Sequence, residues 1–132
     1  LSHLENNKIR FIVDDCIKFV EREKRRGNKY DVIIMDPPSY GRGPNGETWK
    51  FEKNIYELVI KCMDILSDEP LLLLINSYTT GISSTVLANI LKVTLLEKYP
   101  DYEIECGEIG LPITNNNLVL PCGIYGRFAK KD

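Results

Sequence analysis

Five consecutive residues, Asp36-Pro37-Pro38-Ser39-Tyr40, combine the side chains and the backbone best suited to chemistry in this sequence. Two prolines fix φ and remove two backbone donors, so this 36–40 turn presents carbonyl oxygens and the Asp36 carboxylate from a stiff backbone. Such acceptors can hold an amino group, and the Tyr40 ring offers a face on which an extruded base can stack. A proline-rich surface turn is the alternative interpretation, but the position at the end of a buried strand favours function.

Polar residues also follow two other predicted strands. Asp14 and Asp15 follow an apolar run over residues 9–13, and residues 76–80 end an apolar run over residues 70–77. In open α/β sheets, ligands bind beyond the carboxyl ends of the strands, so we expect these ends to share one site. The candidates for contact with a substrate are Ser39, Arg42, Lys50, Asn76 and Ser77, with Arg127 as a further phosphate ligand and Trp49 and Phe51 as packing partners for a nucleotide.

The apolar pattern predicts strands that alternate with helices. Residues 9–13, 30–36 and 70–77 indicate strands, and consecutive apolar residues in the last two are typical of strands covered on both faces. A helix begins at Asp14 or Asp15 and ends at Gly27, and Ser83 or Ser84 can cap another. Residues 39–52 read as a polar connection, either a lid or an ordinary surface loop. The helical residues expected in the core are Ile55, Leu58, Val59, Cys62, Leu66, Val86, Leu87, Ile90, Leu91 and Leu95.

The tail predicts a different arrangement, with strands over residues 102–110 and 118–129 joined by a polar turn around residues 115–117. These strands are expected to form an antiparallel pair. The predicted fold class is therefore α/β, with a partial Rossmann-like sheet that is mostly parallel and has an antiparallel C-terminal strand pair. A length of 132 residues is enough for one core.

The composition limits the partners. A formal net charge of −2 argues against a general polyanion-binding surface, because nucleic-acid affinity rests largely on Lys and Arg. No apolar run is long enough to cross a bilayer and no signal peptide is recognisable, so no membrane contact and a cytoplasmic location are expected. The four cysteines, Cys16, Cys62, Cys106 and Cys122, form no C-x-x-C pair, which favours buried free thiols over disulfides or a metal site.

The 36–40 turn resembles the D/N-P-P-x-Y/F motif of the class I S-adenosylmethionine-dependent methyltransferases. The resemblance covers nearly the whole chain and points in particular to the 23S ribosomal RNA base methyltransferases of the large subunit. Those enzymes carry an acidic residue after their third strand and, one helix later, a strand that ends in Asp-Pro-Pro. The corresponding residues here are Asp14-Asp15-Cys16 and residues 30–38.

The resemblance implies a role for each matching residue. Asp15, with Asp14 beside it, accepts from the adenine amino group of S-adenosyl-L-methionine, and the backbone amide of Cys16 donates to the adenine ring. Asp15 can serve as a helix cap at the same time. The turn lies beside the transferable methyl group and the acceptor base, which assigns Asp36, Pro37, Pro38 and Tyr40 to catalysis and Asp36 to cofactor contact as well.

The acceptor is expected to be a nitrogen of a ribosomal RNA base. Relatives that methylate a pyrimidine ring carbon need a cysteine in the Pro-Pro turn or after the fifth strand, and residues 37–39 and 76–80 contain none. Transfer to nitrogen requires mainly alignment of its lone pair. The alternatives are a methyltransferase for a protein side-chain amide or a small molecule, and a non-catalytic α/β interaction module.

The family's Gly-rich turn after the first strand and its acidic residue after the second have no counterpart in this sequence. We therefore expect residues 1–132 to be the C-terminal part of a single methyltransferase domain without its first two strands. The family order 3-2-1-4-5-7-6 puts those strands between residues 9–13 and 30–36. Either the first strand should then pair elsewhere or with another copy, or the two missing strands should come from residues outside this sequence. Unpaired edges should promote self-association, the isolated chain should be inactive, and RNA should bind mainly through regions outside this chain.

Overall fold

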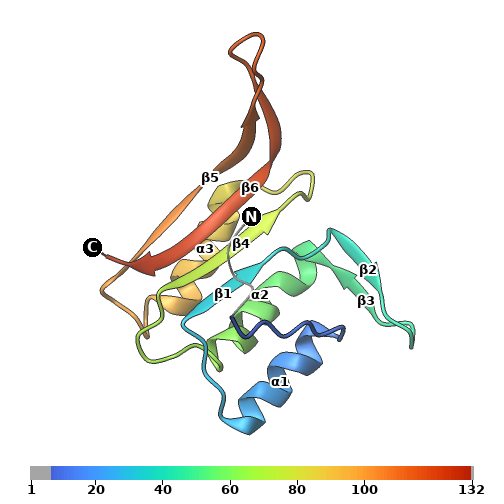
Figure 1. Ribbon diagram of the computed structural model, residues 1–132, viewed down its shortest axis with the longest axis vertical. Helices are drawn as coiled ribbons and strands as arrows, with labels where there is room; N and C mark the ends of the chain where they lie inside the picture. Colours follow the sequence, from blue (N-terminus) through green and yellow to red (C-terminus); the bar gives the residue numbers. More distant parts are fainter. Residues whose placement is uncertain (1–6, 132) are drawn as a thin grey trace.

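The computed structural model describes residues 7–131, which form one mixed four-stranded sheet with helices packed against it (Figure 1). The strands are β1 (Val32–Met35), β4 (Leu72–Ser77), β5 (Tyr102–Pro112) and β6 (Val119–Lys130), in the order β1-β4-β6-β5. β1 is parallel to β4, whereas β6 is antiparallel to both β4 and β5. The α/β class and the antiparallel C-terminal pair are confirmed, and the order agrees with the expected 4-5-7-6 part of the family sheet.

Local signals explain the helix α1 (Cys16–Arg26). The Asp15 side chain accepts a hydrogen bond of 3.0 Å from the backbone N–H of Lys18, which caps the first turn. Gly27 ends the helix with φ of 71°, a left-handed conformation that glycine adopts without a Cβ penalty. The predicted bounds of this helix are confirmed.

The core lies between the sheet and the helices α2 (Phe51–Met63) and α3 (Ser84–Leu95). α3 packs closely on β6, since a Cβ added at Gly126 would lie 2.8 Å from the Cβ of Leu87. The expected core stripe is largely confirmed, with two differences. Val86 is exposed, and Leu66 is buried but lies beyond the end of α2.

Residues 9–13 form no strand, so that prediction was wrong. Phe11 is 91% exposed, and this segment pairs with no strand among residues 7–131. The expectation that both strands are covered on both faces was also wrong. Ile34 of β1 is 62% exposed, and β4 alternates between buried and half-buried residues. A strand-like apolar pattern needs a partner before it becomes a strand.

Residues 39–52 contain a hairpin that the sequence did not predict. β2 (Tyr40–Arg42) pairs antiparallel with β3 (Thr48–Lys50), and the hairpin projects beyond the carboxyl end of β1 (Figure 1). Gly46 has φ of 85° in the connecting turn, where a side chain would be strained. Phe51 begins α2 and is fully buried, so it anchors the base of the hairpin to the core.

The four cysteines are free thiols, but the expected burial holds only for Cys62. Cys16 and Cys106 are exposed, and Cys122 is half-buried. Within residues 7–131, no cluster of side chains suited to a metal ion is present. In the same part of the chain, no helix has both the length and the apolar character needed to cross a bilayer.

Candidate functional site

A cavity of about 790 Å³ lies where the carboxyl end of β1 meets the start of α1 and the β2–β3 hairpin. This α1–β1 cavity brings together three segments that are distant in the sequence. The predicted site residues that line it are Asp14, Asp15, Cys16, Asp36, Pro37, Pro38 and Arg42.

The start of α1 supplies acceptors and donors to the cavity. One oxygen of Asp14 accepts from the backbone N–H of Asp15 at 2.8 Å, and the other pairs with Arg22. The hydrogen bond from Arg22 lowers the pKa of the Asp14 carboxyl below its ordinary value, so Asp14 stays ionised. Cys16 is the first residue of the helix, where backbone N–H groups have no partner within the helix. An adenine, which has an amino donor and ring-nitrogen acceptors, fits this combination of carboxylate and free amide.

The 36–40 turn is held from three sides. The Trp49 Nε1 group of β3 donates to the carbonyl oxygen of Pro38 at 2.6 Å. The backbone N–H of Phe51 donates to the Ser39 carbonyl at 3.0 Å, and the Thr79 hydroxyl donates to the Ser39 hydroxyl at 2.9 Å. The turn is therefore fixed by the hairpin, by the first residue of α2 and by the segment after β4, while the Asp36 side chain remains exposed.

Three residues that the sequence assigned to substrate or nucleotide contact, Tyr40, Lys50 and Phe51, do not line the α1–β1 cavity. Tyr40 is half exposed, and its hydroxyl accepts from Arg42 Nε at 2.9 Å, so both project from the hairpin. Lys50 lines no cavity described for residues 7–131. Phe51 is fully buried, so the idea that it packs against a nucleotide was wrong.

Arg127 is not brought to the turn. It lies opposite Leu74, in the middle of β4, and its guanidinium pairs with Glu105 at 2.9 Å. An arginine that is engaged at mid-strand does not serve the phosphates expected near the strand end. The sequence did not reveal this because the register of β6 against β4 depends on contacts between distant segments.

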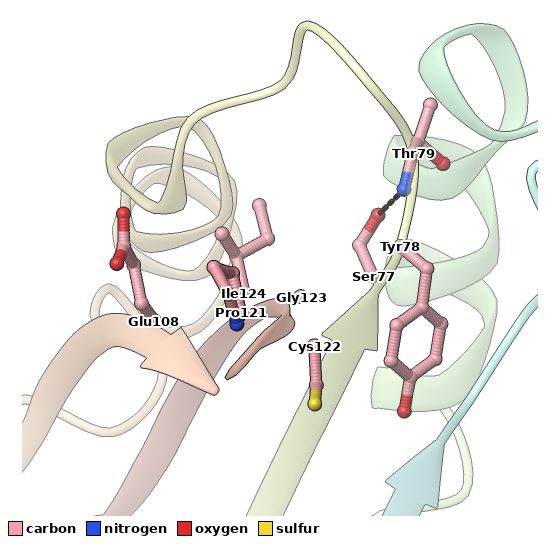
Figure 2. Close-up of a pocket in the computed structure, with 8 residues that line it drawn as sticks. All are labelled: Ser77, Tyr78, Thr79, Glu108, Pro121, Cys122, Gly123 and Ile124. Carbon is pink, nitrogen blue, oxygen red and sulfur yellow. Dashed lines mark hydrogen bonds between the residues drawn. The ribbon is translucent and has the colours of Figure 1, made fainter. Parts of the chain in front are cut away.

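A second pocket, of about 320 Å³, lies at the carboxyl end of β4 (Figure 2). Ser77, a predicted substrate residue, lines this β4-end pocket and is only 1% exposed. The other predicted residue, Asn76, pairs with Tyr125 in the sheet and lines neither cavity. Tyr78 and Thr79 also line it and belong to the strand end over residues 76–80 that the sequence pointed to. Sequence reasoning missed the other lining residues, although Pro-Cys-Gly in the apolar run of β6 is a local signal of an interrupted strand. They are Glu108, Pro121, Cys122, Gly123 and Ile124.

Comparisons with known proteins find methyltransferases similar to this chain in sequence and in structure. No family model matches the chain. Over 40 residues it is 45% identical to the ribosomal RNA large subunit methyltransferase I of Salmonella arizonae and 42% identical to that of Escherichia coli O1:K1 / APEC. Each match covers 30% of this chain and 10% of the relative, so the shared segment is a small part of those proteins.

Similarity in structure extends over nearly the whole chain. A crystal structure of the SAM-dependent methyltransferase from Agrobacterium tumefaciens superimposes with a TM-score of 0.86 and 30% identity, covering 97% of this chain and 42% of that one. The M1.HpyAVI–SAM complex superimposes with a TM-score of 0.58 and 14% identity, covering 94% of this chain and 56% of that one. The second likeness concerns the fold alone. This chain spans less than half the length of the Agrobacterium protein.

Proposed function

We propose that this chain, which has the fold of the class I S-adenosylmethionine-dependent methyltransferases, is part of such an enzyme. We propose further that the protein containing it methylates a base of ribosomal RNA. The observation that carries the proposal is the α1–β1 cavity, in which Asp15 and Cys16 share one space with Asp36, Pro37 and Pro38. The 40-residue similarity to large-subunit ribosomal RNA methyltransferases supports RNA as the substrate.

The start of α1 is the adenine end of the proposed cofactor site. S-adenosyl-L-methionine supplies a methyl group activated by its positively charged sulfur. The Asp15 carboxylate accepts from the adenine amino group, and the free backbone N–H of Cys16 donates to a ring nitrogen. Asp14, which is held by Arg22, fixes the backbone that precedes the helix. The Asp36 carboxylate belongs to the 36–40 turn and lines the same cavity.

The 36–40 turn is the acceptor end. Trp49 already donates to the carbonyl of Pro38. The Asp36 carboxylate and the Pro37 carbonyl are therefore the acceptors that hold the amino or ring N–H group of the base. Holding that group aligns the nitrogen lone pair with the methyl carbon, and alignment of this kind supplies most of the rate in such a transfer. Tyr40 offers a half-exposed ring against which the base can stack.

A second candidate acceptor is a ring carbon of a pyrimidine, because the fold brings a thiol close to the turn. Cys122 lines the β4-end pocket together with Thr79, whose hydroxyl contacts Ser39. A cysteine near the target base is what carbon methylation by covalent catalysis requires. Nuclease digestion of the methylated RNA followed by mass spectrometry of the nucleosides separates the two, since N-methyl and C5-methyl products differ in retention and fragmentation.

The rest of the methyltransferase domain is proposed to complete the cavity. The chain corresponds to 42% of the Agrobacterium protein, and the exposed residues Val32 and Ile34 of β1 line the cavity. Further strands would pair with the free edge of β1, and the helices that accompany them would cover these side chains. RNA would be recruited in the cytoplasm by regions outside this chain, whose net charge is −2. In isolation we expect the free edge of β1 to promote self-association and methyl transfer to be absent.

The test uses the full-length protein, radiolabelled S-adenosyl-L-methionine and purified large-subunit ribosomal RNA. Methylation is expected in the parent protein and should fall about 10²-fold or more in Asp36→Ala, because orientation of the acceptor is lost. Asp68→Ala is the matched control, since Asp68 is an exposed carboxylate in the loop before β4, at the opposite end of the sheet. Label in a glutamine-containing peptide instead of RNA would favour the amide acceptor, and cofactor binding without label in any acceptor would favour the non-catalytic module.

A further inference from the structure

We propose that the β4-end pocket binds the acceptor base itself, as an uncharged planar ring, while the phosphates of the RNA stay outside it. The inference rests on the proposed function and names where and how that function recognises its substrate. Three observations support it: the position of the pocket beside the 36–40 turn, the backbone features that shape it and the side chains that line it.

The pocket lies directly beside the 36–40 turn. Thr79 lines the pocket, and its hydroxyl contacts the hydroxyl of Ser39 in the turn at 2.9 Å. The α1–β1 cavity, in contrast, is bordered by Asp36, Pro37 and Pro38 of the same turn. The turn thus separates a cofactor-sized cavity from a smaller pocket, which is the arrangement needed to present an acceptor to a methyl group.

Two backbone features give the pocket its shape. The pairing of β5 with β6 shifts register between Ile109 and Gly110, an irregularity of the kind that bends strands next to functional sites. On the opposite strand, Gly123 has φ of 148°, and a Cβ there would lie 2.7 Å from both the Ser77 carbonyl oxygen and the Tyr78 ring. Only glycine permits this close approach of β6 to the end of β4.

The lining selects a neutral ring with hydrogen-bond donors. Figure 2 shows Glu108 of β5 and Ile124 of β6 on one side of the pocket and Ser77, Tyr78 and Thr79 on the opposite side, with Cys122 between them. The lining includes hydroxyls, one thiol and one carboxylate, and no lysine or arginine. A phosphate would meet the Glu108 carboxylate without a cation to offset it, whereas an amino group can donate to that carboxylate.

The buried Ser77 side chain adds a fixed polar point. Its hydroxyl oxygen accepts from the backbone N–H of Thr79 at 3.2 Å, the bond drawn as a dashed line in Figure 2. The hydroxyl hydrogen can then donate to a ring nitrogen or carbonyl of a base. A pocket of about 320 Å³ is at the lower end of the range for small ligands, as a single nucleoside requires.

Three cysteines make the proposal testable without an activity assay. Cys16 lines the α1–β1 cavity, Cys122 lines the β4-end pocket, and Cys106 is exposed on β5 and lines neither. The full-length protein is alkylated with iodoacetamide, and the rate at each cysteine is followed by peptide mass spectrometry. The probes are S-adenosylhomocysteine, the four ribonucleosides, their 5′-monophosphates, ribose 5-phosphate and N-acetylglutamine amide.

The expected result is selective protection. S-adenosylhomocysteine slows alkylation of Cys16, and at least one nucleoside slows that of Cys122 by about fivefold at a concentration of roughly four times its Kd, since protection follows 1 + [L]/Kd. Cys106 is unaffected in both cases. The 5′-monophosphate protects no better than its nucleoside, and Glu108→Gln weakens protection by amino-bearing nucleosides, whereas Glu103→Gln on the same strand does not.

The contrary results are distinct. Protection of Cys122 by ribose 5-phosphate as strong as that by a nucleoside, or protection by N-acetylglutamine amide alone, overturns the base pocket. Protection of Cys16 by S-adenosylhomocysteine with no nucleoside effect on Cys122 overturns this inference and leaves the proposed function standing. Absence of protection at Cys16 counts against the proposed function itself. Gly123→Ala, which pushes a methyl group against Ser77, should remove nucleoside protection and keep that by S-adenosylhomocysteine.

Discussion

The indole nitrogen of Trp49 donates a hydrogen bond of 2.6 Å to the carbonyl oxygen of Pro38. This bond joins β3 of the hairpin to the 36–40 turn, and Trp49 also lines the α1–β1 cavity. Because Gly41 pairs with Trp49 in the hairpin, the same strand pairing that builds the hairpin brings the indole over the turn. In the proposed function Trp49 is therefore a positioning residue, which would act on the acceptor through Pro38.

Replacing Trp49 with phenylalanine should slow methyl transfer more than it weakens cofactor binding. The ring still packs, but one neutral hydrogen bond is lost, which is worth about 1 kcal/mol or roughly a fivefold to tenfold change in rate. Steady-state kinetics should assign the loss to kcat, and calorimetry should give an unchanged Kd for S-adenosylhomocysteine. Tyr56→Phe, at an exposed aromatic residue of α2, is the control. An unchanged kcat in Trp49→Phe would show that the hydrogen bond from Trp49 to Pro38 does not contribute to methyl transfer.

Two substitutions at Asp15 separate the helix cap from the cofactor contact. Serine caps a helix about as well as aspartate but lacks a carboxylate of the same reach, whereas alanine does neither. We expect Asp15→Ser to retain the unfolding free energy and Asp15→Ala to lose about 1 kcal/mol. Both should weaken binding of S-adenosylhomocysteine about tenfold to a hundredfold, because a hydrogen bond to a charged group is lost. Thermal unfolding and calorimetry measure the two effects, and full affinity in the serine variant would reduce Asp15 to a cap.

The parts of the fold that could be predicted are those with local signals. α1 has its cap at Asp15 and its stop at Gly27, and the turn at residues 36–40 ends β1 by proline chemistry. The failures are non-local. Residues 9–13 have the pattern of a strand but no described neighbour, and the β2–β3 hairpin forms in a polar segment because Trp49 and Phe51 attach it to the turn.

The site divides in the same way. The proposed cofactor end at residues 14–16 and the 36–40 turn could be located because each is a short run of residues with its own local signal, the helix cap at Asp15 and the two prolines. The β4-end pocket was not, since it arises where Ser77 pairs with Ile124 across forty-odd residues of intervening helix and strand. Spacing in the sequence carries no information about that register, although the glycine and proline beside Cys122 marked an interruption.

Glu23 makes the stability of α1 dependent on acid pH. Its carboxylate accepts from the hydroxyl of Tyr30 at 2.5 Å and from Asn28 and Arg26, and these bonds, led by that from Tyr30, lower its pKa from 4.5 to about 2. The ionised Glu23 carboxylate therefore stabilises the fold fully above about pH 4.5, and this stabilisation is lost as the pH falls from there toward about 2. Urea midpoints should therefore favour the parent over Glu23→Gln at pH 7, with the difference shrinking over that interval.

Tyr30→Phe is the matched variant for this effect. It removes the bond that contributes most to the lowered pKa of Glu23, so the acid-dependent loss should be smaller than in the parent and should be complete at a higher pH. Glu69→Gln, at an exposed carboxylate before β4, should follow the parent curve. A difference between the parent and Glu23→Gln that stays constant from pH 7 to pH 2 would mean that the network around Glu23 does not form.

The thiol of Cys62 should report when the core opens. It lies on the buried face of α2, and burial raises its pKa from 9.0 to about 12, so the reactive thiolate is scarce in the folded protein. Iodoacetamide at pH 8 should modify the exposed Cys106 at the rate of a free thiol and Cys62 about 10³-fold or more slowly, a factor set by the free energy of unfolding. Adding urea should bring the two rates together at the unfolding midpoint. Equal rates at Cys62 and Cys106 in the absence of urea would contradict the packing of α2 against the sheet.

The same thiol makes stability depend on alkaline pH. Because the thiol of Cys62 ionises above about pH 9 in the unfolded chain and not until about pH 12 in the folded protein, the free energy of unfolding should fall as the pH rises between these values, and less so in Cys62→Ala.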